Sequence, residues 1–428
     1  MVVLTTGSAT RRQRAAIAAL SLLLIAAVAA GVLIATRGRL RTGPAAGLPA
    51  RSAAQFLDSV GVNVHISYYD TAYGQFDRWS PALRELGVRH IRDGLVFDQP
   101  QYVAELRRLA AEGVRATLIV GDTQRPPQDA VALATGPLRP AVEALEGPNE
   151  IDATGGNWEG VLRTFMPQLR AAQRASALRG LPLLGPSFVQ HGSRTAVQDL
   201  AGAWDIDNVH PYPGGHEPGS NIESEITGIA RPGRPIMATE TGYHDALDAT
   251  TGQPPVPDDV AAAYIPRLYL EYFAAGVRRT FLYELLDEKP DPGLTAPEQH
   301  FGLMRSDLAP KPAFTALRDL LQVIRTSPGG GDAPPVTVSG GGDVRTLLLQ
   351  RADGSRVLLL WRRASLWDPD ARRRERVDDV GVAVRFAGTA RDLATYRPAE
   401  GAAPVARAAE ADGVRVAVGG DVTALSFR

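Results

Sequence analysis

The chain has 428 residues, with 46 lysines and arginines against 47 aspartates and glutamates, and it contains no cysteine. This length accommodates one large domain and a smaller one. The near-zero net charge argues against a nucleic-acid partner, and the lack of cysteine excludes disulfides, thiolate metal ligands and cysteine nucleophiles.

The first predicted element is an uncharged stretch at 15–36, which is bounded on each side by three arginines. Its 22 residues would extend roughly 33 Å as a helix at about 1.5 Å per residue, which is enough to cross the hydrocarbon core of a bilayer. The apolar region of a cleaved signal usually has only ~7–15 residues. We therefore predict a transmembrane anchor at 15–36, a cytoplasmic N-terminus at 1–14 and a tether at 37–55. A cleaved signal segment is the alternative.

Between residues 56 and 326, eight short apolar runs alternate with amphipathic stretches. Helix-boundary signals frame some of these stretches, such as Ser80-Pro81 at a start and Gly87 at an end. The predicted strands are 60–67, 88–93, 116–121, 142–150, 182–186, 207–212, 235–240 and 279–286. Eight strand–helix repeats predict an α/β fold, a (β/α)8 TIM barrel at 56–326. An open doubly wound sheet is the alternative, although it rarely needs eight units and no glycine-rich phosphate loop follows the first strand.

The segment 327–335, SPGGGDAPP, is typical of a linker. Beyond it, residues 336–428 show short apolar strands separated by turn residues and no helical pattern. This pattern predicts an all-β sandwich domain. Its Trp361 and Trp367 are candidates either for the domain core or for contact with a sugar.

Polar side chains close most of the predicted barrel strands. Because the carboxyl ends of barrel strands meet at one rim, these side chains are expected to lie together. In strand order they are Asn63, His65, Arg92, Asp93, Asp122, Asn149, Glu150, His210, Tyr212, Glu240, Tyr283 and Glu284. Two glutamates delivered to one rim, Glu150 and Glu240, make an acid/base and nucleophile pair suited to breaking glycosidic bonds.

Such a pair works only if its surroundings separate the two pKa values. An arginine next to one carboxylate lowers its pKa and keeps it charged, and Arg92 is the available candidate. Tyr212 can hold the same carboxylate by a hydrogen bond. Asn149 can present its amide to the 2-hydroxyl of a sugar.

This ordered set resembles clan A of the glycoside hydrolases, and families 5 and 39 in particular. The carrying motifs are Asn149-Glu150 closing the fourth strand, Glu240 closing the seventh, Arg92 on the second and His210-x-Tyr212 on the sixth. The resemblance covers about residues 59–324. It implies a retaining glycosidase that acts on an oligo- or polysaccharide without cofactor or metal. By the same resemblance, the residue roles are acid/base for Glu150, nucleophile for Glu240, 2-hydroxyl ligand for Asn149, and support for Arg92, His210 and Tyr212.

The end of the eighth strand departs from the clan, because Glu284 stands where many members carry an aromatic platform. Glu284 could bind sugar hydroxyls, or an amine or cation on an unusual sugar. Trp158 and Tyr243 follow the fourth and seventh strands and suit stacking on a sugar face, although Trp158 suits helix packing equally well. His65 is either a wall of the site or a structural residue.

Three alternatives stay open. The two glutamates could instead cap the helices that follow them. The barrel could be a catalytically silent glycan binder at the cell envelope, or a transglycosylase that uses the same residues. A sugar-cleaving domain is most useful outside the cell, so we expect a single-pass membrane protein with an extracytoplasmic catalytic domain, or a secreted one.

Overall fold

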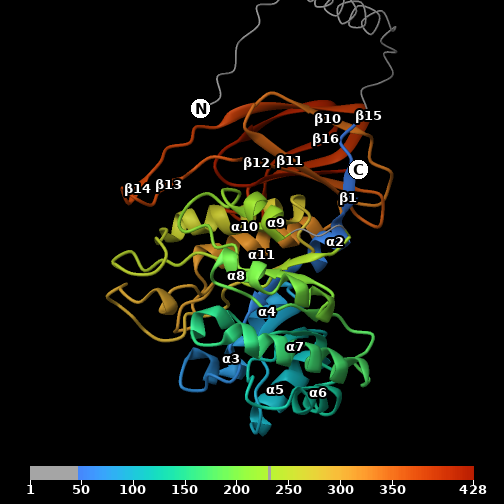
Figure 1. Ribbon diagram of the computed structural model, residues 1–428. Helices are drawn as coiled ribbons and strands as arrows, with labels where there is room; N and C mark the ends of the chain where they lie inside the picture. Colours follow the sequence, from blue (N-terminus) through green and yellow to red (C-terminus); the bar gives the residue numbers. More distant parts are fainter. Residues whose placement is uncertain (1–46, 230–232) are drawn as a thin grey trace, which may run out of the picture. The chain divides into compact units, whose positions relative to one another are not determined.

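The computed structural model describes residues 47–229 and 233–428 (Figure 1). The predicted anchor at 15–36 and the N-terminus at 1–14 lie outside the described residues. Within the described ranges, no helix is both long enough and apolar enough to cross a membrane.

Eight parallel strands form a nearly closed barrel, as the sequence predicts. They are β2 (Val60–Asn63), β3 (His90–Gly94), β4 (Arg115–Ile119), β5 (Val142–Glu146), β6 (Leu183–Leu184), β7 (Asp207–Val209), β8 (Ile236–Ala238) and β9 (Arg279–Leu282). The hydrogen-bonded order is β6-β5-β4-β3-β2-β9-β8-β7. A parallel bridge between Leu184 and Ile206 brings the two edge strands together.

The barrel is filled by apolar side chains. Ala144, Leu184, Ile206, Met237 and Phe281 form one buried cluster drawn from the strands. A Cβ atom on Gly61 would lie 2.5 Å from the Phe281 ring, so only glycine leaves room for that ring.

Helices follow the barrel strands in sequence. They are α3 (Phe76–Trp79) and α4 (Pro81–Leu86) after β2, then α5 (Pro100–Ala111), α6 (Pro127–Thr135), α7 (Trp158–Arg174), α8 (His191–Ala196), α9 (Ile222–Ile229), α10 (Asp258–Ala274) and α11 (Pro312–Arg325). Prolines begin α4, α5, α6 and α11, because proline's fixed φ and missing N–H suit the first turn of a helix. Gly87 ends α4 in the left-handed conformation, with φ 71°.

The C-terminal strands, orange to red in Figure 1, form a separate all-β domain. Its sheet contains β1 (Ala50–Ser52), β10 (Val336–Ser339), β11 (Val344–Gln350), β12 (Arg356–Arg362), β15 (Val380–Tyr396), β16 (Pro404–Val418) and β17 (Thr423–Phe427), and a separate pair comprises β13 (Trp367–Asp368) and β14 (Arg373–Arg374). The long strand β15 pairs with β10 and with β16, and its last residues pair with β17.

The N-terminal part of the described chain corrects the predicted tether at 37–55. Residues Ala50–Ser52 form β1, which pairs in parallel with β11, and Ala53–Asp58 form helix α2. Three residues are too few to show the alternation that identifies a strand, and β1 is recognisable only by its pairing.

The β domain packs against barrel helices α10 and α11. Leu347 and Leu359 belong to the large buried cluster that also contains residues of α10 and α11, whereas Leu348 and Leu358 belong to the core of the β domain itself. Trp361 is buried and its indole N–H donates to Glu271 Oε1 at 2.7 Å. Trp367 is buried as well. Both tryptophans are therefore core residues, and neither is available to contact a sugar.

Candidate active site

A cavity of about 780 Å³ opens at the carboxyl ends of the barrel strands. Its walls include nine of the predicted strand-end residues, which come from six different strands or from the residues just after them. They are Asn63, Arg92, Asp93, Asn149, Glu150, His210, Tyr212, Glu240 and Tyr283. His65 also lines the cavity. The structure thus brings together the residues that the sequence singled out.

Arg92, on β3, lies at the base of the site with a fully engaged guanidinium group. Two of its nitrogens bond the carboxylate of Glu146 at 2.7 and 2.9 Å, and a third donates to Glu240 Oε1 at 2.6 Å. Asn63 and Asn149 accept two further bonds. Burial alone would lower the pKa of Arg92, but the negative charges of Glu146 and Glu240 raise it above its ordinary value. The guanidinium therefore stays charged.

Glu240 follows β8 and is held through both carboxylate oxygens. Arg92 bonds Oε1, and the hydroxyl of Tyr212 donates to Oε2 at 3.0 Å. Burial raises the pKa of Glu240, but the electrostatic interactions with His210 and Arg92, together with the hydrogen bonds from Arg92 and Tyr212, outweigh burial and lower it. Glu240 is therefore kept ionised.

Glu150 has different surroundings. Its side chain is 32% exposed against 11% for Glu240, and its Oε1 lies 2.8 Å from His210 Nδ1. The backbone at Glu150 is left-handed, with φ 43°, and its N–H donates to the Ser187 hydroxyl at 2.8 Å. Such a conformation is uncommon for a residue other than glycine, and it persists only where neighbouring contacts fix it.

The hydrogen-bond chain behind His210 shows that one proton is held between His210 and Glu150. Asn208 donates its Nδ2 hydrogens to a carboxylate and a carbonyl, so its Oδ1 accepts. The only hydroxyl hydrogen of Thr239 goes to an acceptor, either Asn208 Oδ1 or Glu146 Oε1. Thr239 must then accept from His210 Nε2, 3.0 Å away.

With Nε2 carrying a hydrogen, the 2.8 Å bond from His210 Nδ1 to Glu150 needs one more proton. That proton lies either on Nδ1 of a charged imidazole or on the carboxyl group of Glu150. In both cases the pair carries one proton at the mouth of the site.

The carboxylates of Glu150 and Glu240 lie close together. One oxygen of each and one nitrogen of His210 all lie within 4.8 Å of one another. The two carboxylates therefore share one cleft while their surroundings differ.

Three predicted contact residues lie away from the cavity wall. Trp158 packs edge-on against Phe188 with ring centroids 5.7 Å apart, and Phe188, rather than Trp158, lines the cavity. Tyr243 is buried and donates to the His216 carbonyl at 2.8 Å. Glu284 is fully buried behind His65. Tyr243 and Glu284 lie in the protein interior, and Trp158 is half-buried at the start of α7, so the expectation of direct sugar contact is corrected for all three.

Several site residues were missed in the sequence. Glu146 anchors Arg92 from inside an apolar strand, where no pattern distinguishes it. Ser187 bonds both the Glu150 backbone and Asn149 Oδ1. A polar residue just after the fifth predicted strand was the signal that could have identified Ser187. Phe301 and Glu298 also line the cavity, from the long loop after β9.

Comparison with known proteins identifies the fold. No protein-family model and no curated protein matches the chain. Among solved structures, it is similar to a family 39 glycoside hydrolase from Bacteroides cellulosilyticus WH2, with a TM-score of 0.63, 14% identity, and coverage of 89% of this chain and 82% of that one. It is also similar to the family 39 enzyme of Xanthomonas axonopodis pv. citri, with a TM-score of 0.56, 16% identity, and coverage of 91% and 99%.

A third similar structure is a family 39 β-xylosidase from Caulobacter crescentus, with a TM-score of 0.54, 15% identity, and coverage of 89% of this chain and 97% of that one. The chain therefore has the fold of the family 39 glycoside hydrolases, barrel and β domain together, which confirms the predicted architecture.

Proposed function

We propose that this protein is a retaining glycoside hydrolase that cleaves O-glycosidic bonds of an oligo- or polysaccharide, with Glu150 as acid/base and Glu240 as nucleophile. The observation that carries the proposal is the pair of carboxylates within one cleft, their nearest oxygens no more than 4.8 Å apart. Retaining enzymes space the two carboxyl groups ~5–5.5 Å apart, whereas inverting enzymes leave ~6.5–9.5 Å for a water molecule.

In the first step, Glu240 attacks the anomeric carbon and forms a glycosyl–enzyme ester. The bond from that carbon to the leaving oxygen breaks, and Glu150 gives the oxygen its proton. The lowered pKa of Glu240 supports its role as the ionised partner. The 2.8 Å hydrogen bond between His210 Nδ1 and Glu150 Oε1 supports Glu150 as the donor, because it gives Glu150 a neighbour with which to exchange that proton.

In the second step, the carboxylate of Glu150 takes a proton from water. The resulting hydroxide attacks the anomeric carbon and displaces Glu240. The product keeps the configuration of the substrate because the carbon is inverted twice. Glu240 regains its charge beside Arg92 and Tyr212, which already donate hydrogen bonds to it.

Asn149 suits the role of ligand for the sugar 2-hydroxyl. Its Oδ1 accepts hydrogen bonds from Arg92 at 2.7 Å and from Ser187 at 3.0 Å. With Oδ1 engaged, the amide nitrogen is left as a donor directed to the substrate. A contact of this kind strengthens in the transition state and so accelerates the reaction.

A screen of aryl glycosides tests the proposal. Since one similar structure is a β-xylosidase, aryl β-xylosides are tried first, followed by other aryl β-glycosides and cell-wall polysaccharides. We expect turnover by the wild-type chain and none by Glu240→Gln, which keeps the shape of the side chain and removes its charge. Turnover that persists in Glu240→Gln would contradict the assignment.

We also propose that the predicted segment at 15–36 anchors the enzyme in the membrane with its catalytic domain outside the cytoplasm. The support is the length of that uncharged stretch and the arginines on both sides of it.

A further inference from the structure

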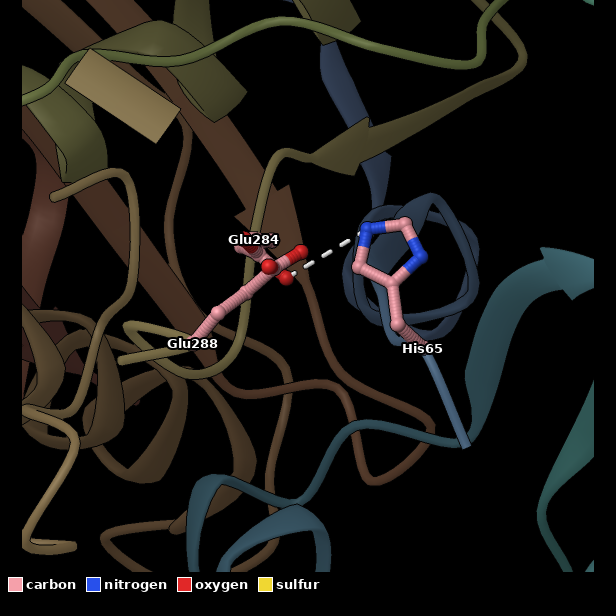
Figure 2. A group of neighbouring side chains, drawn as sticks. All are labelled: His65, Glu284 and Glu288. Atoms are coloured by element: carbon pink, nitrogen blue, oxygen red, sulfur yellow. Dashed lines mark ion pairs between the residues drawn. The ribbon is translucent and has the colours of Figure 1, made fainter. Parts of the chain in front are cut away.

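A second cluster of ionisable side chains lies beside the cavity and has no part in the proposed reaction. It contains His65, from the loop after β2, and Glu284 and Glu288, from the loop after β9 (Figure 2). One side-chain nitrogen or oxygen of each residue lies within 4.8 Å of the others. Figure 2 shows one imidazole nitrogen directed at the two carboxylate groups, which lie side by side.

Two buried atoms of this cluster have no hydrogen-bond partner among the described residues. They are His65 Nε2 and Glu284 Oε1. The side chain of Glu284 is fully buried, and its Oε2 lies 3.5 Å from His65 Nε2. Leaving a buried polar atom unpaired costs about 1–3 kcal/mol, and more for a charged group. Both unpaired atoms point to a missing partner.

Among the described residues, the two glutamates also lack a basic partner from outside the cluster at ion-pair distance, and Lys289 acts on Glu288 only at longer range. Within 47–229 and 233–428, no lysine or arginine forms an ion pair with Glu284 or Glu288. The nearby Lys289 pairs with Asp70, and Lys311 is engaged by other aspartates.

We propose that His65, Glu284 and Glu288 bind a divalent transition-metal ion of the Zn²⁺ class. The ligands are Nε2 of His65 and one oxygen from each glutamate. A nitrogen with two carboxylate oxygens is a donor set that Zn²⁺ accepts, whereas Ca²⁺ and Mg²⁺ prefer oxygen ligands alone.

The geometry of the cluster fits such an ion. Two ligands at ~2.0–2.1 Å from a tetrahedral zinc lie roughly 3.3 Å apart, close to the 3.5 Å between His65 Nε2 and Glu284 Oε2. The hydroxyl of Tyr73 donates to Glu284 Oε2 at 2.7 Å, which is the kind of outer contact that orients a metal-bound carboxylate. The His65 ring is stacked on Tyr68 with centroids 4.6 Å apart, which fixes its direction.

A bound ion gives the unpaired Nε2 of His65 a partner and offsets the negative charge of the glutamates. Because His65 also lines the active-site cavity, the ion would fix one wall of that cavity.

The test is a titration of the full chain, purified in detergent and stripped of metal with EDTA. Zn²⁺ binding is followed by calorimetry and Co²⁺ binding by visible absorption, so neither readout depends on hydrolysis. We expect one ion per chain. Glu288→Gln and His65→Asn should each weaken binding at least about 100-fold, because even outer-shell partners contribute about 10–100-fold. Tyr73→Phe should weaken it by about 10–100-fold.

The matched control is Glu112→Gln, which removes the same charge from an exposed carboxylate outside the cluster that lies 4.0 Å from Arg84, and its affinity should stay at the wild-type value. Failure of the wild-type chain to bind Zn²⁺ or Co²⁺ saturably would overturn the proposal. Zn²⁺ binding that survives in both Glu288→Gln and His65→Asn would also overturn the proposal. A preference of the wild-type chain for Ca²⁺ over Zn²⁺ would overturn it as well. Loss of binding in Glu150→Gln, with Glu288→Gln unaffected, would place the ion at the catalytic pair instead.

Discussion

Replacing Tyr212 with phenylalanine tests how Glu240 is kept ionised. The substitution removes a hydroxyl that donates to Glu240 Oε2 at 3.0 Å and keeps the ring that packs edge-on against Phe301. A hydrogen bond to a charged group contributes about 1.5–3 kcal/mol. At about 1.36 kcal/mol per pKa unit, its loss should raise the pKa of Glu240 by about 1–2 units.

The assay is the pH dependence of kcat/KM, whose acidic limb reports the ionisation of the free enzyme. Because the nucleophile must be ionised, a higher pKa moves the acidic limb upward by the same ~1–2 units. On that limb kcat/KM should fall about 10- to 100-fold relative to wild type. Tyr69→Phe is the matched control, since Tyr69 donates to Glu105 Oε2 at 3.2 Å away from the cavity. An acidic limb that stays in place in Tyr212→Phe, or moves equally in Tyr69→Phe, would refute the reasoning.

The other predictions concern the two glutamates, the arginine and the N-terminus. Glu240→Ala should abolish turnover, because no covalent intermediate can form. Glu150→Ala should keep activity on aryl glycosides with acidic leaving groups, and added azide should raise its rate. An equal loss of activity in both variants, without rescue by azide, would contradict these roles. Arg92→Met should lower the free energy of unfolding by about 3–5 kcal/mol, measured by chemical denaturation, because Glu146 is left buried without a countercharge. A decrease in the free energy of unfolding of less than about 1 kcal/mol would contradict this expectation. The full chain should stay with the membrane fraction through a carbonate wash. A mature chain in the medium that begins after residue 35 would show that the segment at 15–36 is a cleaved signal rather than an anchor.

The sequence was sufficient to predict the barrel and most of the residues that line the candidate active site, for one physical reason. A polar residue that follows an apolar run lies at the carboxyl rim, and every such strand end meets at the same rim. Arg92, Glu150, His210 and Glu240 all follow this rule, and the structure places all four on one cavity.

Other features depended on the paths of loops and on pairing between distant segments. Tyr243 comes three residues after Glu240 and Trp158 eight residues after Glu150, and their loops place Tyr243 in the interior and Trp158 against Phe188. Glu146 lies within a strand that is buried on both faces, so alternation does not reveal which side it occupies. Strand β1 exists only through its pairing with β11, which no local pattern predicts.

The stereochemistry of hydrolysis tests the central claim most directly. The measurement is proton NMR of the first sugar released from an aryl β-glycoside that the enzyme turns over, recorded before the anomers equilibrate. Because one oxygen of each carboxylate lies within 4.8 Å of the other, whereas inverting enzymes separate the two carboxyl groups by ~6.5–9.5 Å, we predict that the β-anomer appears first. First appearance of the α-anomer would show inversion and would contradict the double displacement through Glu240.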